Sequence, residues 1–210
     1  MPTIEKARAW YSDSDPVHDF EHVLRVYRMA ERLAEAEGAD LEIVRAAALL
    51  HDAEGATSGS ESRTNHHHAS ADFAAQVLAA EGWDPARIAA VQHCIRAHRW
   101  RGTEAPQTLE AKVLFDADKL DVLGAIGVAR VIGYAARSEM PFYFPPSQQF
   151  LATGREIDGE PHSAYHEHLF KLKKVRDRMY TETARELASE RLEALDQFFE
   201  RLIDEWKGNM

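Results

Sequence analysis

The sequence predicts an all-α protein, a helical bundle that forms a single domain over residues 1–210. Three observations support this fold class. Apolar residues recur every three to four positions over most of the chain, which is the periodicity of helices with one buried face. Capping residues and glycines divide these stretches into segments of helical length. No segment shows the apolar and polar alternation of a strand, and we therefore expect about seven to nine helices.

Length and composition limit the class of protein further. With 210 residues, 45% of them hydrophobic, the chain can form one substantial core but is short for two. Its net charge of -10 disfavours a nucleic-acid polymer or an anionic membrane surface as the main partner. The single cysteine, Cys94, excludes an internal disulfide and is compatible with the cytoplasm, where we expect the protein. No stretch approaches the ~18 apolar residues of a membrane-spanning helix. The sequence leaves the oligomeric state open.

Helix boundaries in the first half of the chain are marked by capping residues. Asp15 and Pro16 are predicted to start a helix that Gly38 ends. Asp40 caps the next helix, and a polar loop over 56–65 follows it. Further helix starts are predicted at the triplet His66 to His68, at Asp84 with Pro85, and at Thr108.

The C-terminal part contains one long break in the helical pattern. The stretch 139–161 holds several prolines and four aromatic residues without helical periodicity. We expect it to be a lid loop that is mobile without ligand and lies near the mouth of the site. Helices resume over 163–207, beginning with a predicted helix over 165–180. Thr183 and Glu186 are predicted to form a capping box at the start of the last helix.

The apolar run 46–50 ends abruptly in His51 and Asp52. A helix that is apolar on every side is buried, so these two polar side chains reach the core or its border. An isolated His-Asp pair is usually a hydrogen-bonded core histidine followed by a polar cap. However, His22 and Asp118 also interrupt apolar helices. Two imidazoles and two carboxylates form a ligand set suited to a divalent ion, and coordination positions left for water and substrate would make the site catalytic.

The order of these residues resembles the HD-domain metal-dependent phosphohydrolase superfamily. The resemblance covers about residues 18–137, and the stretch 116–127 has the form Asp-Ala-Asp-x-Leu-x-x-Leu-Gly-Ala-Ile-Gly, as in small bacterial HD hydrolases. The matching motifs are His22-x-x-Arg25-Val26, His51-Asp52, and Asp118 within Ala117-Asp118-Lys119-Leu120-Asp121.

The resemblance implies a metal site and a reaction. The metal ligands would be His22, His51, Asp52 and Asp118, and they would bind one divalent ion, which could be Mn, Mg, Ni, Fe, Co or Zn. The reaction would be hydrolysis of a small phosphate ester or anhydride, with a nucleotide as the leading substrate and phosphate or pyrophosphate as the product. The ion would lower the pKa of a bound water and neutralise the charge that develops on the phosphoryl oxygens.

Two residues are candidates for catalysis beside Asp52. His93 and His98 both match positions in related sequences, but five residues apart they lie on different faces of a helix, and we expect His98 to reach the site. Family members with two metals use extra histidines near these positions, which makes a dinuclear centre the alternative. Glu54 is a candidate general base or water-orienting residue, although a surface carboxylate at a helix end is the simpler interpretation.

Three residues are candidates for binding the substrate phosphate. Arg25 and Lys119 are cations close in sequence to the metal ligands and could offset a di- or triphosphate, or else be ordinary solvated side chains. Successive helical positions point about 100 degrees apart, so the histidine triplet cannot face one site together, and we choose His68. The doublet His18-Asp19 is expected to be a decoy for the metal motif at a helix start, although His18 could still border the site one turn before His22.

Two other interpretations belong to different functional classes. The chain could be a non-catalytic regulatory module, an HD fold that binds a metal or nucleotide without turnover. The intact set of four ligands argues against it, because a scaffold could replace Asp52 or His51 by apolar residues at little cost. A purely structural bundle would leave polar breaks in three apolar helices unexplained.

Overall fold

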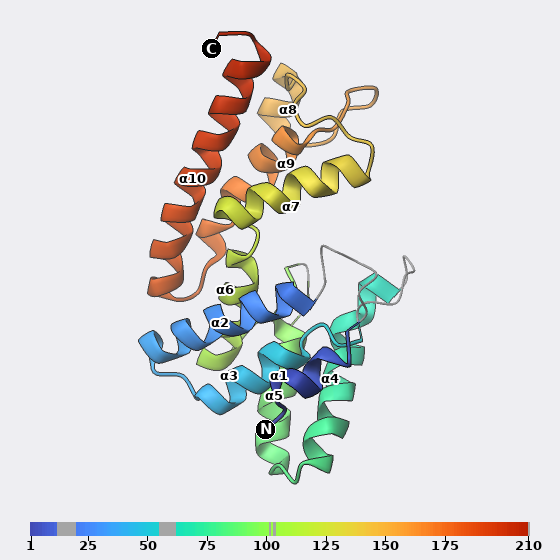
Figure 1. Ribbon diagram of the computed structural model, residues 1–210, viewed down its shortest axis with the longest axis vertical. Helices are drawn as coiled ribbons and strands as arrows, with labels where there is room; N and C mark the ends of the chain where they lie inside the picture. The colour runs from blue at the N-terminus through green and yellow to red at the C-terminus, as the bar shows by residue number, and fades with distance from the viewer. Residues whose placement is uncertain (12–19, 55–61, 101, 103, 210) are drawn as a thin grey trace. The chain divides into compact units, whose positions relative to one another are not determined.

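A computed structural model describes the protein over residues 1–11, 20–54, 62–100, 102 and 104–209, with the backbone alone at 62–65. Over these residues the all-α prediction is confirmed, because every regular element is a helix (Figure 1). No helix among them combines the length and apolarity needed to cross a membrane. The chain divides into two compact units. The first unit comprises Met1–Asp118 and Tyr180–Ala184, and the second comprises Lys119–Met179 and Arg185–Met210.

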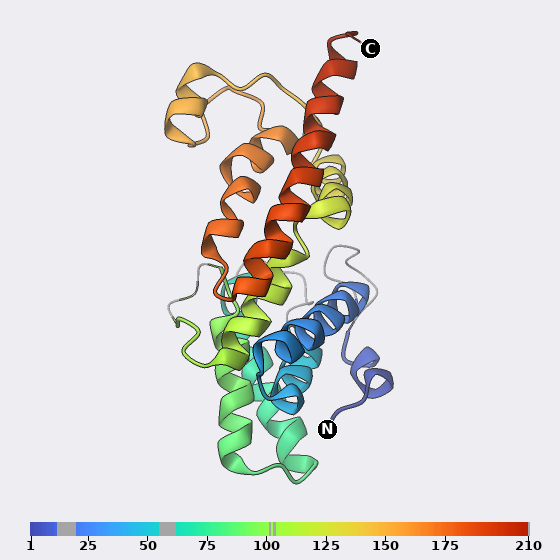
Figure 2. The same cartoon turned by 90° about the vertical axis from the view of Figure 1, so that its left-hand side faces the viewer.

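The first unit is built around α3 (Leu41–Leu50). Seven of the ten residues of α3 are buried, so this helix is enclosed on nearly every side, as its sequence predicts. The unit also contains most of α6 (Leu109–Leu120). The helices packed against α3 are α1 (Ile4–Arg8), α2 (Phe20–Glu37), α4 (Ser62–Ala80) and α5 (Pro85–Ala97) (Figures 1 and 2).

Predicted capping residues start three of these helices. Asp40, Asp84 and Thr108 each accept a hydrogen bond from a backbone amide two or three residues later. Gly38 ends α2 with a φ of 79 degrees, in the left-handed region that favours glycine. The predicted start at Asp15 lies outside the described residues.

Two predicted boundaries in this unit are wrong. α4 begins at Ser62, so the histidine triplet lies inside a helix and not at its start. The last helix, α10 (Glu182–Trp206), is capped by Thr181, whose Oγ1 accepts from the amide three residues later at 3.3 Å. The capping box of Thr183 and Glu186 does not form there, because the Thr183 amide donates to Glu37 Oε1 at 3.0 Å. A carboxylate distant in sequence therefore takes the place of the local partner.

The second unit holds the remaining helices. The predicted helix over 165–180 is wrong, because it ends at Phe170 and two three-residue 3-10 helices follow. Leu172 and Val175 are both buried, and a 3-10 helix places residues three apart on the same side, whereas an α-helix does not align them fully. The helices of this unit are α7 (Gly124–Arg137), α8 (Gln148–Thr153), α9 (Ala164–Phe170) and the rest of α10, which is drawn in red in Figure 2.

The segment 139–161 contains more regular structure than a loop prediction implies. It includes α8, which Ser147 caps and Gly154 ends with a φ of 62 degrees. Glu160 then accepts a hydrogen bond from the Ser147 amide at 2.9 Å and another from His166 Nε2 at 2.9 Å. These bonds fasten the segment within its own unit. Its action as a lid stays a prediction.

His168 in α9 predicts a pH dependence of stability. The ring is 1% exposed, lies 2.8 Å from Asp196 Oδ1 and stacks on Phe199. Burial lowers the pKa of His168 to about 4, despite the opposing charge of Asp196. The folded state therefore favours the neutral ring. The neutral ring therefore contributes its full stabilisation above about pH 6.5, the pKa of histidine in the unfolded chain. As the pH falls toward 4 this stabilisation is lost, which lowers the free energy of unfolding by up to about 3 kcal/mol.

Urea unfolding between pH 4 and 7.5 would measure this dependence. His168→Gln is expected to be less stable at neutral pH but to lose less stability on acidification than the original chain. Equal losses in the two proteins would contradict the prediction, since other histidines would then account for the whole effect.

Candidate metal centre

His51 and Asp52 lie where α3 ends. His51 is fully buried, and its Nδ1 lies 2.8 Å from the carbonyl oxygen of Ala48. A carbonyl only accepts, so Nδ1 carries the proton and Nε2 keeps its lone pair. Within the described part of the chain, His51 Nε2 and Asp52 Oδ1 are buried and have no hydrogen-bond partner. Buried acceptors without a partner in the protein are explained by bound cations.

His22 and Asp118 bring further ligand atoms to the same place. His22 is 2% exposed, and its Nε2 lies 3.5 Å from Asp118 Oδ1 and 4.0 Å from Asp52 Oδ2. His51 Nε2 lies 3.5 Å from the same oxygen of Asp52. Residues from α2, the end of α3 and α6 therefore converge, although they are far apart in sequence.

A second group lies on the other side of the Asp52 carboxylate. His66 Nε2 is 3.5 Å and His98 Nε2 is 3.6 Å from Asp52 Oδ1. His98 Nδ1 lies 2.5 Å from the carbonyl oxygen of Ile95, so this ring is fixed in the same way as His51 and also directs Nε2 to the site. Asp52 thus faces two sets of possible ligands, one with each of its oxygens.

The protonation states suit metal binding. Burial lowers the pKa of His51 to about 4, so the imidazole is neutral at physiological pH. Burial alone would raise the pKa of Asp52, but the positive charge that His51 and His98 can carry outweighs this effect. The pKa of Asp52 is therefore held well below its usual range. A neutral imidazole and an ionised carboxylate are the forms that bind metal ions.

The residues fit a divalent ion by geometry as well. One candidate group is His22, His51 and Asp118, whose ligand atoms all lie within 4.8 Å of one another, and the other is Asp52, His66 and His98. Two ligands about 2.1 Å from one tetrahedral ion lie ~3.4 Å apart, so only small adjustments separate these atoms from coordination. Mixed nitrogen and oxygen donors suit Mn, Fe, Co, Ni or Zn.

The histidine triplet requires a correction. The structure places His66 beside Asp52, whereas His68, the predicted member, is exposed. His67 is buried and 5% exposed. The reason is the rotation of α4, which buries positions 67, 71, 74 and 78 and turns 68 and 72 to solvent. That apolar spacing is visible in the sequence and could have excluded His68.

His93 does not join the site. Its Nδ1 lies 2.6 Å from Glu104 Oε1, and its Nε2 accepts from the Gln107 amide at 3.0 Å. Both ring nitrogens therefore hold the chain that leads from α5 to α6. The structure thus separates this histidine from His98, as the difference in helix face predicts.

The remaining predicted site residues are Glu54, Arg25 and Lys119. Glu54 is exposed, and its backbone amide donates to Ser70 Oγ at 3.2 Å. Arg25 lies on α2, partly buried, one turn after His22. Lys119 is a partly buried residue of α6. The roles of these three side chains stay predictions, and His18 lies outside the described residues.

Comparison with known proteins identifies the family of this chain. The chain belongs to the HD-domain family, since the family described as "HD domain" matches residues 19–123. One relative is an uncharacterised protein of Bacillus subtilis (strain 168), YpgQ, which is 32% identical over 212 residues, covering 99% of this chain and 96% of the relative.

Solved structures extend the comparison. The crystal structure of Bacillus subtilis YpgQ in complex with ADP is 31% identical and has a TM-score of 0.73 over 97% of each chain. An HD-superfamily hydrolase from Bacillus thuringiensis is 29% identical, with a TM-score of 0.72 over 97% of this chain and 96% of its own. Both are similar to this chain over nearly its whole length.

Proposed function

We propose that the protein is a divalent-metal-dependent phosphohydrolase that acts on a small phosphate ester or anhydride, with a nucleotide as its substrate. The observation that carries this proposal is the convergence of buried imidazoles on two carboxylates, Asp52 and Asp118. Such a site has affinity for a divalent ion and leaves ligand positions for water and a phosphoryl oxygen.

His22, His51, Asp52 and Asp118 would hold the ion. When bound, it supplies a water of lowered pKa and a positive charge for the phosphoryl oxygens. The chain supplies the orientation, because the bond from His51 to the Ala48 carbonyl fixes the direction of its free nitrogen. Asp52, which faces both ligand groups, would fix their positions relative to each other.

The proposal includes roles for the remaining candidates. His98, with His66, would bind a second ion or orient the attacking water, so a dinuclear centre is the alternative to a single ion. Glu54 would accept a proton from that water. Arg25 and Lys119 would bind phosphate oxygens through charge-assisted hydrogen bonds.

The nucleotide class is supported by the ADP complex of YpgQ. A nucleoside diphosphate carries the phosphate groups that an ion and nearby cations can hold. The same complex is compatible with the alternative of a regulatory module that binds a nucleotide without turnover. The two functions differ in whether product is released.

Metal analysis followed by a release assay tests the proposal. The purified protein would be assayed for bound metal, then for phosphate and pyrophosphate release from nucleoside mono-, di- and triphosphates with Mn, Mg, Ni, Co, Fe and Zn. One or two equivalents of metal would distinguish a mononuclear from a dinuclear centre. Chelator-sensitive release would support the hydrolase. Nucleotide binding without release from any of these substrates would favour the regulatory module.

Lys119→Ala is expected to weaken substrate binding or turnover while the metal content stays unchanged. A charge-assisted hydrogen bond to phosphate contributes about 1.5–3 kcal/mol, so kcat/KM should fall roughly 10- to 100-fold. Lys112→Ala, on the same helix, is the control and should have little effect. Loss of metal together with activity in the Lys119 variant would instead indicate that Lys119 supports Asp118.

A further inference from the structure

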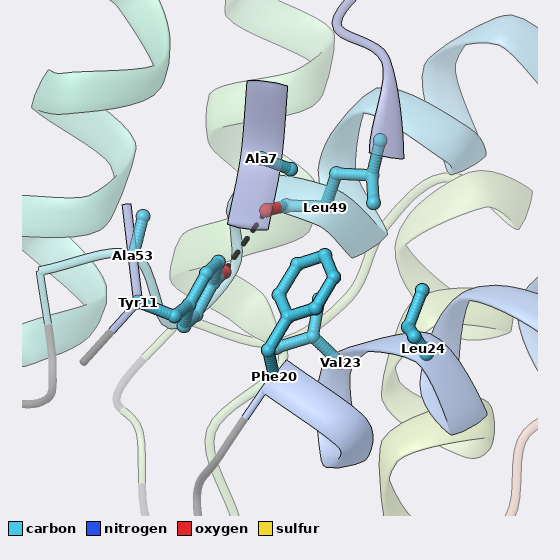
Figure 3. Close-up of a cluster of buried hydrophobic side chains, with 7 residues drawn as sticks. All are labelled: Ala7, Tyr11, Phe20, Val23, Leu24, Leu49 and Ala53. Carbon is cyan, nitrogen blue, oxygen red and sulfur yellow. Dashed lines mark hydrogen bonds between the residues drawn. The ribbon is translucent and has the colours of Figure 1, made fainter. Parts of the chain in front are cut away.

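Tyr11 contacts the two helices that carry His22 and His51. Its ring centre lies 5.5 Å from that of Phe20, the first residue of α2, which precedes His22 by two positions. Its hydroxyl donates a hydrogen bond to the carbonyl oxygen of Leu49 at 2.9 Å, two positions before His51 (Figure 3). Tyr11 is only 8% exposed, so both contacts are shielded from water.

The bond to Leu49 completes the last turn of α3. Carbonyl groups in the last turn of a helix have no partner within that helix. Here the carbonyl of Ala48 accepts from a ring of the His-Asp doublet, and that of Leu50 accepts from the Ala53 amide at 3.3 Å. The carbonyl of Leu49 lies between them, and the Tyr11 hydroxyl is its partner. This hydroxyl therefore satisfies a buried acceptor in the turn that presents the metal ligands.

An apolar cluster encloses this hydrogen bond. Leu49 and Ala53 flank the His-Asp doublet in sequence, and both belong to the cluster, so the backbone of the doublet is held from both sides. Burial, and then the charge of Asp52, raise the pKa of the Tyr11 phenol well above its usual value, and the hydroxyl stays a donor. The buried members are Ala7, Tyr11, Phe20, Val23, Leu24, Leu49 and Ala53 (Figure 3).

We propose that Tyr11 is a positioning residue for the metal centre, because it joins the start of α2 to the end of α3 and so sets the separation of His22 and His51. The centres of these two rings are 5.6 Å apart. The inference rests on the metal site of the proposed function, but it does not require hydrolysis. Groups that orient metal ligands typically change metal affinity by about 10- to 100-fold when they are removed.

Tyr11→Phe tests this role because it removes the hydroxyl and keeps the ring. We expect the affinity of the metal-free protein for Mn²⁺, measured by calorimetry, to fall at least about tenfold. The visible spectrum of the Co²⁺-loaded protein should also change, since that spectrum reports ligand geometry. Tyr27→Phe is the matched control, because Tyr27 packs against the same cluster from its edge. It should keep both the original affinity and the original spectrum.

Amide hydrogen exchange at Asp52 and Ala53 in the metal-free chain separates this inference from the proposed function. If the unmodified protein binds no Mn²⁺, the proposed function fails, while faster exchange in Tyr11→Phe than in Tyr27→Phe still supports the role of Tyr11 in fixing this turn. Unchanged exchange and unchanged affinity in Tyr11→Phe would overturn the proposal. Equal losses in both variants would overturn it too, because the effect would then be one of general stability.

Discussion

Replacing Asp52 by alanine is expected to abolish hydrolysis and to remove most of the bound metal. Asp52 lies within 3.5 Å of His51 Nε2 through one oxygen and within 3.5 Å of His66 Nε2 through the other, so its carboxylate takes part in both ligand groups. An anionic ligand interacts strongly with a cation in a site of low dielectric. We therefore expect metal affinity to fall by more than the roughly 10- to 100-fold typical of an outer-shell partner.

The controls for Asp52→Ala are histidine variants. His68→Ala changes an exposed residue near the site, and His18→Ala changes the predicted decoy, so both should retain metal and turnover. The metal-free Asp52→Ala chain is expected to stay folded, because Asp118 then faces one fewer like charge. Metal stoichiometry and turnover would be compared in all three proteins. The assignment fails if the Asp52 variant keeps both while the His18 variant loses them.

Helix positions could be predicted wherever the determining interaction is local. Asp40 and Asp84 accept bonds from amides two or three residues away, so their capping is encoded within one turn. The start of α10 could not be predicted in this way, because the Thr183 amide binds Glu37, which is 146 residues away in sequence. Local patterns therefore fail where a tertiary partner competes for the same backbone group.

The same distinction applies to the candidate site. His22, His51, Asp52 and Asp118 could be singled out because each is a polar residue within or at the end of an apolar helix. Their approach to one another is a tertiary result, which the sequence indicated only through the resemblance to a family. Whether a side chain binds phosphate depends on its neighbours from other helices. The spacing of residues along one helix does not predict those neighbours.

Three aspartates in one stretch show that sequence position alone does not identify a metal ligand. Asp116, Asp118 and Asp121 all interrupt the apolar pattern of the same helix and the turn after it. Asp118 lies beside His22, whereas Asp121 forms an ion pair with Arg130. Asp116 is fully buried and accepts hydrogen bonds from the start of α10. Its donors are the Tyr180 amide at 2.9 Å, the Thr181 amide at 2.8 Å and the Thr181 hydroxyl at 2.8 Å.

Asp116→Ala is therefore expected to destabilise the fold without removing a metal ligand. Three donors lose their acceptor, and each buried donor left unsatisfied costs about 1–3 kcal/mol, so the free energy of unfolding should fall by about 3–5 kcal/mol. Urea unfolding would measure the loss, and Asp72→Ala, an exposed carboxylate on α4, is the control that should change stability little. Metal stoichiometry of the folded fraction should match that of the unmodified protein. A loss below about 1 kcal/mol would show that the contact between Asp116 and the start of α10 contributes little. Loss of metal from protein that remains folded would show that Asp116 acts on the site.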